Sequence, residues 1–447
     1  MSSTQTSTET TTLRLSSQHP AHALTIQPGR LINTIHETAE WGAKFPWGDE
    51  PTETGVCRLA LSDNDKKVKD WLIEETKKLG CEVTVDSMGN IFALYPGLEK
   101  DAKPTAMGSH LDTQPTGGRY DGIYGVLTGL EVLRTLKENN YIPRFPIVLI
   151  NWMNEEGARW PMACMASSVW ADVYSAEEIY KMESITDDVP KRVVDELERI
   201  GYKGELPCSH LNYPIAAHFE IHIEQGPVLE RLDKKIGIVT SVQGHSWWKV
   251  HVKGKAQHTG TTPMDMRSDA LLAAAKMIVR VNEIALECGG YGSTGTLDLA
   301  PGVMNVIPGE VTFGLDFRHV EDTGMKKQIE MARESFTKIA KETGDKVTVE
   351  LEHIHTHDAT HFNKTCIQCV RESSVELYGE DQCLEVVSGA AHDSCFTALH
   401  VPTSMIFIPS KDGVSHNPEE YSTPAQCHEG FLAMLGAVLK YDALRDH

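Results

Sequence analysis

The order of elements along the first half of the chain is the strongest constraint on its fold. From residue 28 to about residue 240, helical spacing ("DKKVKDWLIEETKKLG") alternates with short apolar runs ("NIFALYPG", "PTAMGSHLDT", "PIVLINW"). Parallel neighbours need a crossover connection, and a helix usually provides it, so this alternation favours a largely parallel sheet covered by helices. The sequence therefore predicts an α/β fold.

Around residue 243 the order of elements changes. Strand patterns at "SWWKVHVKG", "STGTLDLAPG", "GEVTFGLDFRHV" and "KVTVELEHIH" enclose helical patterns at 267–288 and 323–342. This β-α-β-β-α-β order is the plan of a ferredoxin-like domain. Helix and strand patterns of the first kind resume after residue 360. We predict a main domain of residues 28–242 and 359–447, an inserted α+β domain of residues 243–358, and a disordered polar tail of residues 1–27.

Composition excludes several classes of function. The 447 residues carry a formal charge of -21, which disfavours nucleic acid and anionic lipid as partners. We find no apolar run long enough to span a membrane and no secretory signal, so we expect a cytoplasmic location. The ten cysteines have no regular spacing and are expected to be reduced. Cys366 and Cys369 form one C-x-x-C within a helical pattern, and we expect a structural role for them.

Histidines and carboxylates gather at the ends of the predicted strands, where open α/β sheets bind ligands. They are His110, Asp112, Asp121, Glu155, Glu156, His222, Glu224, His392 and Asp393. Singly, each has a structural explanation, such as a turn or a helix cap. Together they have the ligand chemistry of zinc or a similar divalent ion. Asp112 lies two residues after His110 and could hold its second ring nitrogen, and His218 is expected to be structural.

Two adjacent acids end the strand "PIVLINW". Neighbouring like charges at the end of a buried strand are costly unless something compensates them. If Glu156 binds a metal ion, the cation compensates its charge. Successive side chains in extended backbone diverge, so Glu155 can then act as a general base toward the attacking water.

Six motifs in one order resemble a known family: "GSHLDTQPTGGRYDG", "NEEGARW", "HFEIHIEQGPVLE", "QHTGTTP", "DFRH" and "SGAAHDS". They resemble the dizinc amidohydrolases that cleave N-carbamoyl groups, relatives of zinc aminoacylases and carboxypeptidases, and within these the fungal β-alanine synthases. The resemblance implies a zinc-peptidase-like catalytic domain with a mixed, largely parallel sheet and an inserted dimerisation or lid domain. It also implies two Zn²⁺ per chain, with Mn²⁺, Co²⁺ or Ni²⁺ as possible substitutes.

The resemblance also implies residue roles. Asp121 would bridge the two ions, His110 and His222 would complete one site, and Glu156 and His392 the other. Glu155 would be the catalytic base, and Asp112 would support His110.

Further roles fall mainly on the inserted domain. Gln225 would meet the ureido group, and Asn305 and Arg318 would bind the substrate's carboxylate. His258 would stabilise the transition state in the neighbouring subunit of a homodimer. Because these residues and the metals lie in different domains, substrate is expected to favour closure about hinges near residues 242 and 359.

The favoured reaction is hydrolysis of N-carbamoyl-β-alanine to β-alanine, CO₂ and NH₃, a step of pyrimidine catabolism. Alternatives are an N-carbamoyl-L-α-amino-acid hydrolase, an allantoate amidohydrolase, a dipeptidase or aminoacylase, and, from another class, a catalytically silent dimeric binding protein. Ala391 and Gln257 depart from the family's usual motifs, so the preferred N-carbamoyl acid can differ.

Overall fold

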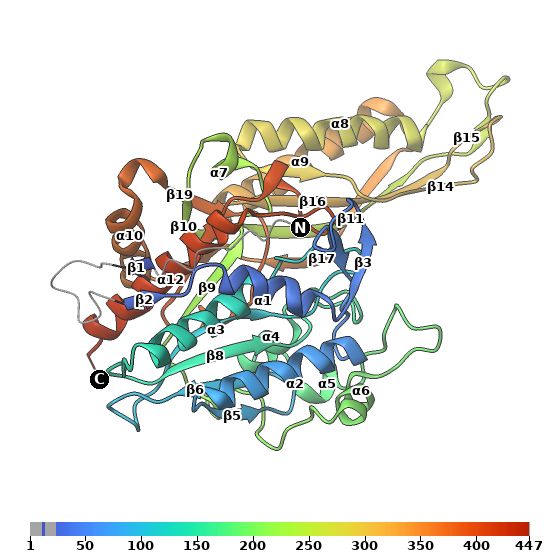
Figure 1. Cartoon of the computed structure of the whole chain (residues 1–447). Coiled ribbons are helices and arrows are strands. Elements are labelled where there is room, and N and C mark those ends of the chain that lie inside the picture. The colour runs from blue at the N-terminus through green and yellow to red at the C-terminus, as the bar shows by residue number, and fades with distance from the viewer. Residues whose placement is uncertain (1–10, 14–23, 447) are drawn as a thin grey trace. The chain divides into compact units, whose positions relative to one another are not determined.

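The computed structural model describes residues 11–13 and 24–446, and the chain divides into two compact units (Figure 1). The first unit runs up to Thr240 and resumes at His361, and the second is Ser241–Thr360. The predicted insertion, 243–358, lies inside the second unit, two residues short of its bounds at each end. Each unit has its own hydrophobic core.

A mixed nine-stranded sheet forms the centre of the first unit. Its order is β18-β10-β20-β9-β7-β8-β6-β5, and β19 pairs with β10. The strands β8, β7, β9 and β20 are mutually parallel, whereas β5, β6 and β10 pair antiparallel with their neighbours. The predicted fold class, an α/β fold with a parallel sheet at its centre, is confirmed. The strands are β5 Glu82–Val85, β6 Ile91–Tyr95, β7 Thr105–His110, β8 Ile147–Trp152, β9 Ala217–Ile223, β10 Ile236–Val242, β18 Thr360–His361, β19 Cys383–Ser388 and β20 Thr403–Ile408.

Helices cover this sheet. Two of them, α3 and α12, are buried almost all round, which their apolar sequences allow. Figure 1 shows α1, α3 and α12 packed together. The helices are α1 Arg30–Ala39, α2 Asp63–Lys78, α3 Ile123–Glu138, α4 Met165–Trp170, α5 Ala176–Ile179, α6 Val193–Ile200, α7 Val228–Arg231, α10 Lys364–Tyr378, α11 Asp393–Thr397 and α12 Pro424–Leu444, with short 3₁₀ turns η2 Glu380–Gln382 and η3 Lys411–Gly413.

Strand β9 shows how the sheet separates packing from polar contacts. Phe219, Ile221 and Ile223 belong to the apolar core that includes α3 and α12. The alternate residues His218 and Glu220 instead hydrogen bond Ser394 at the start of α11. Because all seven residues of β9 are buried, polar side chains on this strand need partners within the protein. The face of β9 turned away from this core therefore carries polar groups held by hydrogen bonds.

The predicted tail of residues 1–27 is wrong at its C-terminal end. Most of it lies outside the described residues, but β1 (Thr11–Leu13) and β2 (Leu24–Ile26) form an antiparallel pair. Leu24 and Ile26 are buried in the core beside α3, and Asn139 hydrogen bonds both the backbone N–H and the carbonyl of Thr25. Two apolar residues at strand spacing are enough to dock the segment. A second small pair, β3 (Ala43–Pro46) with β4 (Thr54–Val56), follows α1.

The second unit is an antiparallel sheet, in the order β13-β16-β11-β17, packed against two helices. Its elements follow the predicted β-α-β-β-α-β order, with small strands added. They are β11 Gly244–Lys253, β12 Gln257–His258, η1 Met264–Met266, α8 Ala270–Cys288, β13 Tyr291–Ser293, β14 Leu297–Ala300, β15 Val306–Ile307, β16 Glu310–His319, α9 Asp322–Thr343 and β17 Thr348–His357. Alternate residues of β11 and β16 are buried against α8 and α9, as expected for a sheet covered on one face.

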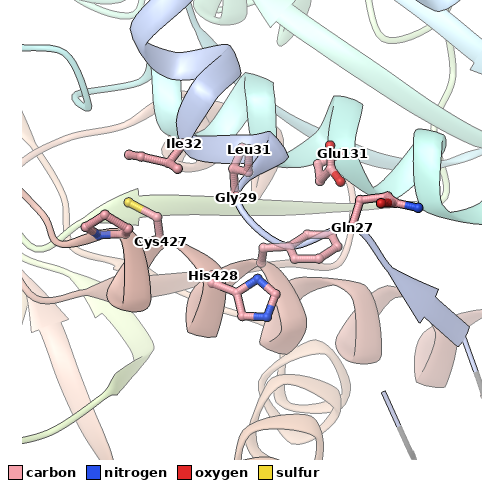
Figure 2. A pocket seen from close by; sticks show the side chains of 9 residues that line it. Gln27, Gly29, Leu31, Ile32, Glu131, Cys427 and His428 are labelled. Atoms are coloured by element: carbon pink, nitrogen blue, oxygen red, sulfur yellow. The ribbon is translucent and has the colours of Figure 1, made fainter. Parts of the chain in front are cut away.

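A small cavity of about 60 Å³ lies among α1, α3 and α12 (Figure 2). Glu131, Cys427 and His428 are among its lining residues. This volume holds one or two waters and no metabolite, so the cavity is no candidate for a substrate site.

None of the helices in the described ranges is long and apolar enough to cross a membrane. All ten cysteines lie in those ranges and carry free thiols, as predicted.

Two ion pairs on α2, one buried and one exposed, allow a test of how burial changes the contribution of an ion pair to stability. Lys69 and Asp65 lie 2.9 Å apart with side chains 2% and 1% exposed, whereas Lys66 and Asp70, at the same spacing, are 41% and 49% exposed. Removing one partner of a buried pair leaves an uncompensated charge, so Lys69→Met is expected to lower the free energy of unfolding by about 3–5 kcal/mol. Lys66→Met is expected to cost about 1 kcal/mol or less. Urea unfolding measures both, and equal losses would contradict the assigned difference.

Candidate metal centre

Three buried side chains converge at the carboxyl end of the parallel strands. His110 is the last residue of β7, His222 lies near the end of β9, and Asp121 comes two residues before α3. Asp121 Oδ1 lies 3.0 Å from His222 Nε2 and 3.5 Å from His110 Nε2. One ligand atom from each of the three residues lies within 4.8 Å of the others.

The hydrogen bonds of the two imidazoles fix which nitrogen faces the carboxylate. His110 Nδ1 lies 2.9 Å from the backbone oxygen of Asp112, and His222 Nδ1 lies 2.8 Å from that of Ile223. A carbonyl oxygen only accepts, so each Nδ1 carries a proton and a neutral ring presents the lone pair of Nε2 to Asp121. His110 Nε2 has no hydrogen-bond partner among the described residues. Lone pairs facing a buried carboxylate require a positive charge between them, either protons or a metal ion.

A second group shares Asp121 and consists of Asp121, Glu156 and His416. His416 Nε2 lies 3.4 Å from Asp121 Oδ2 and 3.2 Å from Glu156 Oε2. Gln114 holds Glu156 with its backbone N–H and its side-chain amide, at 3.1 and 2.9 Å. Hydrogen bonds to the two carboxylates raise the pKa of His416 to about 11, so this site also attracts positive charge.

The structure brings His416, which the sequence analysis did not name, to the second group, while the role predicted for His392 stays a prediction. His392 Nε2 lies 3.1 Å from Ser388 Oγ, and its ring packs 4.6 Å from that of His222. Burial, together with the neighbouring His222, holds the pKa of His392 well below its usual value. Among the described residues it belongs to neither group of converging ligand atoms. His416 lies in the loop after β20, in "GVSHNPEE", several residues beyond the strand end that sequence reasoning searched.

Glu155 and Glu156 diverge as predicted. Glu155 Oε2 lies 3.5 Å from His110 Nε2, and the thiol of Cys164 lies 3.4 Å from Glu155 Oε1. Burial, reinforced by the charges of Asp393 and Glu156, raises the pKa of Glu155 well above its usual value. A buried carboxyl beside the candidate ligands, with a raised affinity for a proton, has the properties of a general base.

The predicted contact between Asp112 and His110 forms through a different atom. The backbone oxygen of Asp112, rather than its carboxylate, accepts the Nδ1 proton of His110. The carboxylate instead accepts the backbone N–H groups of Glu155 and Glu156, each at 3.3 Å. Burial raises the pKa of Asp112 to about 6. Asp112 therefore connects the ends of β7 and β8.

Asp121 is held from several sides. Gln225 Nε2 and Ser415 Oγ donate to its Oδ2 at 2.7 and 2.8 Å, and Glu420 accepts its backbone N–H at 3.0 Å. Although burial opposes ionisation, His222 and His110 hold the pKa of Asp121 well below its usual value. Gly122 has φ +65°, and a Cβ there would meet the His110 ring at 2.2 Å, so the position requires glycine.

The other predicted site residues belong to neither of the two groups of candidate ligands found among the described residues. Glu224 accepts the N–H groups of Val228 and Leu229 at the start of α7, and so has a structural role. In the second unit, the backbone oxygen of Asn305 accepts the N–H of Thr259 at 3.0 Å. Both residues lie directly beside the β12–β15 pair, to which His258 belongs. Arg318 lies on β16 and pairs with Asp316 at 3.0 Å.

The donor set of the two groups fits divalent metal ions. Imidazole nitrogen from His110, His222 and His416 with carboxylate oxygen from Asp121 and Glu156 is the ligand chemistry of zinc. His110 Nε2 faces Asp121 with no hydrogen-bond partner among the described residues, which supports the same conclusion.

The two histidines that compete for the second group can be distinguished by metal content. We expect His416→Ala to bind about one equivalent of zinc less than the wild type, because its group loses one of three ligands. His392→Ala is expected to bind as much zinc as the wild type, since its ring contacts Ser388 instead. Elemental analysis after zinc loading and dialysis measures both variants. The reverse pattern would return His392 to the second group.

The chain is similar in sequence and in fold to known proteins. The model of peptidase family M20/M25/M40 matches residues 106–440. The chain is 36% identical to an N-carbamoyl-L-amino-acid amidohydrolase of Rhizobium meliloti over 94% of its own length and 98% of the relative's. It is 32% identical to a ureidoglycolate hydrolase of Oryza sativa, covering 88% and 82% of the two chains. A crystal structure of a hydantoinase/carbamoylase family amidase from Burkholderia multivorans is similar with TM-score 0.86 and 41% identity, covering 94% and 99%. The chain therefore belongs to peptidase family M20/M25/M40.

Proposed function

We propose that the chain is a metal-dependent amidohydrolase that removes the carbamoyl group from N-carbamoyl-L-α-amino acids, giving the amino acid, CO₂ and NH₃. The observation that carries the proposal is the buried Asp121 facing two imidazole lone pairs, with Glu155 3.5 Å from one of them. Relatives named for this reaction come from several bacteria and are 30–36% identical over more than nine-tenths of the chain. These relatives favour N-carbamoyl-L-α-amino acids as substrates. The sequence motifs had instead favoured N-carbamoyl-β-alanine.

In this proposal His110, Asp121 and His222 hold one ion, and Asp121, Glu156 and His416 hold the other. When bound, the two ions polarise the carbamoyl oxygen and lower the pKa of water. Zinc suits these ligands, and Mn²⁺, Co²⁺ and Ni²⁺ are possible substitutes. Asp112 accepts the backbone N–H of Glu156, and Gln114 donates to its side chain. Glu156 is therefore oriented before substrate arrives.

Glu155 accepts the proton of the attacking water and delivers it to the leaving nitrogen. Glu155 is suited to accept and return a proton because burial raises its pKa and favours the protonated form. Its backbone N–H donates to Asp112, which fixes the backbone that carries the side chain. Water adds to the carbamoyl carbon, the bond between that carbon and the amino acid's nitrogen breaks, and the proton taken from water ends on that nitrogen. The carbamate that remains then decomposes to CO₂ and NH₃.

Gln225 is suited to bind the ureido group. Its Nε2 donates to Asp121 and Ser415, and its buried Oε1 has no hydrogen-bond partner among the described residues. An acceptor held in this way matches the N–H donors of a carbamoyl group. For the second unit, we propose that Arg318 and Asn305 bind the substrate's carboxylate and that His258 stabilises the developing oxyanion.

The base is tested by a conservative substitution. Glu155→Gln keeps the size of the side chain but cannot accept the proton, so kcat is expected to fall by about 10²–10⁴-fold while zinc content is unchanged. The control is Glu205→Gln, at an exposed carboxylate outside the site.

Assays of ammonia release with N-carbamoyl-L-amino acids, N-carbamoyl-β-alanine, allantoate, ureidoglycolate and a dipeptide identify the substrate class. If the zinc-loaded wild type turns over none of the N-carbamoyl acids, the proposed function is wrong; a zinc-free protein would support a silent binding protein.

We also propose a homodimer through the second unit. Leu272, Val279 and Leu286 recur every seven residues on α8 and are 45%, 61% and 74% exposed, so they form an apolar stripe along one face. A second copy of the chain would bury it. Val279→Asp is expected to convert dimers to monomers in light scattering, whereas Leu211→Asp, at an exposed leucine of the first unit, leaves them intact. A monomeric wild type would exclude this proposal.

A further inference from the structure

Four aromatic rings form a patch on one face of the second unit's sheet. They belong to His245 and Trp247 on β11 and to His355 and His357 on β17. The ring of His245 lies 5.2 Å from that of Trp247, 5.5 Å from His355 and 5.8 Å from His357, and Trp247 lies 6.2 Å from His355. The patch is thus continuous across two strands.

This face is the one that α8 and α9 leave uncovered. The alternate residues of β11, among them Trp248, Val250 and Val252, are buried in the core with both helices. Trp247, by contrast, is 44% exposed. A tryptophan on the open face adds nothing to this unit's core, and its ring remains able to pack against a ligand.

The patch adjoins Arg318. In the antiparallel register, His245 lies directly opposite Arg318 and Trp247 lies directly opposite Asp316, which pairs with Arg318. Trp247 is therefore the diagonal neighbour of Arg318 on the same face, at a spacing of about 7–8 Å between backbones. That spacing is within reach of a small molecule with an anionic group at one end and a ring at the other.

Several features favour an aromatic group over a metal ion as the occupant. The rings of His245 and His357 are stacked at an inclination of 5°, and the ring of His355 is tilted by 45° against that of His245. Among the described residues they do not form a group of converging ligand atoms. Burial, together with the nearby His357 and Arg318, lowers the pKa of His245 to about 4, so its ring is neutral at pH 7. The neutral ring of His245 and the indole of Trp247, beside the guanidinium of Arg318, suit a planar apolar group attached to a carboxylate.

We propose that Trp247, with His245, His355 and His357, receives the side chain of the N-carbamoyl amino acid whose carboxylate binds Arg318, and that the enzyme therefore prefers aromatic L-amino acid derivatives. This inference rests on the proposed function and on the assigned role of Arg318. N-carbamoyl-β-alanine has no side chain and would leave the four rings without a partner. Trp247 is on this view a specificity-determining residue.

The test compares kcat/KM of the zinc-loaded full-length enzyme for N-carbamoyl-L-tryptophan, N-carbamoyl-L-phenylalanine and N-carbamoyl-L-alanine. We expect the wild type to favour the aromatic substrates. Trp247→Ala is expected to lower the ratio of aromatic to alanine kcat/KM by about tenfold, mainly through KM, and Trp247→Phe to retain it within about threefold. The matched control is Lys249→Ala, two residues along the same strand on the same face, which is expected to leave the ratio unchanged.

Four outcomes would overturn the inference: no aromatic preference in the wild type, equal losses toward all three substrates in Trp247→Ala, failure of Trp247→Phe to retain the ratio, or an equal change in Lys249→Ala. Each of these requires an enzyme that hydrolyses N-carbamoyl amino acids. They are therefore distinct from failure of the proposed function, in which no N-carbamoyl amino acid is hydrolysed by any form of the protein.

Discussion

Among the residues that the structure describes, Asp121 is the carboxylate that three histidines face. His222, His110 and His416 approach its two oxygens at 3.0, 3.5 and 3.4 Å, and the first two do so with the nitrogen that carries no proton when the ring is neutral. This arrangement is stable only with positive charge among the four groups. The carboxylate of Glu156, 3.2 Å from His416 Nε2, increases that requirement. The centre is thus organised for cations, and the hydrogen bonds to Gln225, Ser415 and Glu420 hold it in place.

The parallel sheet explains how ligands distant in sequence meet. His110 and His222 end neighbouring strands, Asp121 comes before the helix that follows β7, and His416 lies in the loop after β20, the other neighbour of β9. All parallel strands present their carboxyl ends at one edge, so one edge collects these loops. The apolar faces of the same strands pack on α3 and α12, which makes the edge rigid. A rigid edge is what preorganised ligands need.

The sequence predicted the alternation of elements, the inserted unit and most of the site because those depend on local periodicity and on residue type at strand ends. It did not find His416, whose position depends on loop geometry. His392 and His416 both follow strands, and spacing alone favoured the one nearer its strand end. The loop after β20 turns back, with His416 at φ +54°, and this turn brings its ring to Asp121. Likewise, the side chain of Asp112 was expected to support His110, but the backbone oxygen does so, and no residue pattern distinguishes the two.

The adjacent acids at the end of β8 show why ligand and base cannot exchange roles. The backbone there is held from both sides: Asp112 accepts the N–H groups of Glu155 and Glu156, and the N–H of Cys164 donates to the carbonyl of Glu155 at 2.7 Å. With the backbone fixed, the two side chains diverge. Glu156 points to Gln114 and His416, whereas Glu155 is buried beside the Cys164 thiol, where burial raises its pKa and favours the protonated form. The difference in environment, rather than in residue type, makes one carboxylate suited to hold a cation and the other to carry a proton.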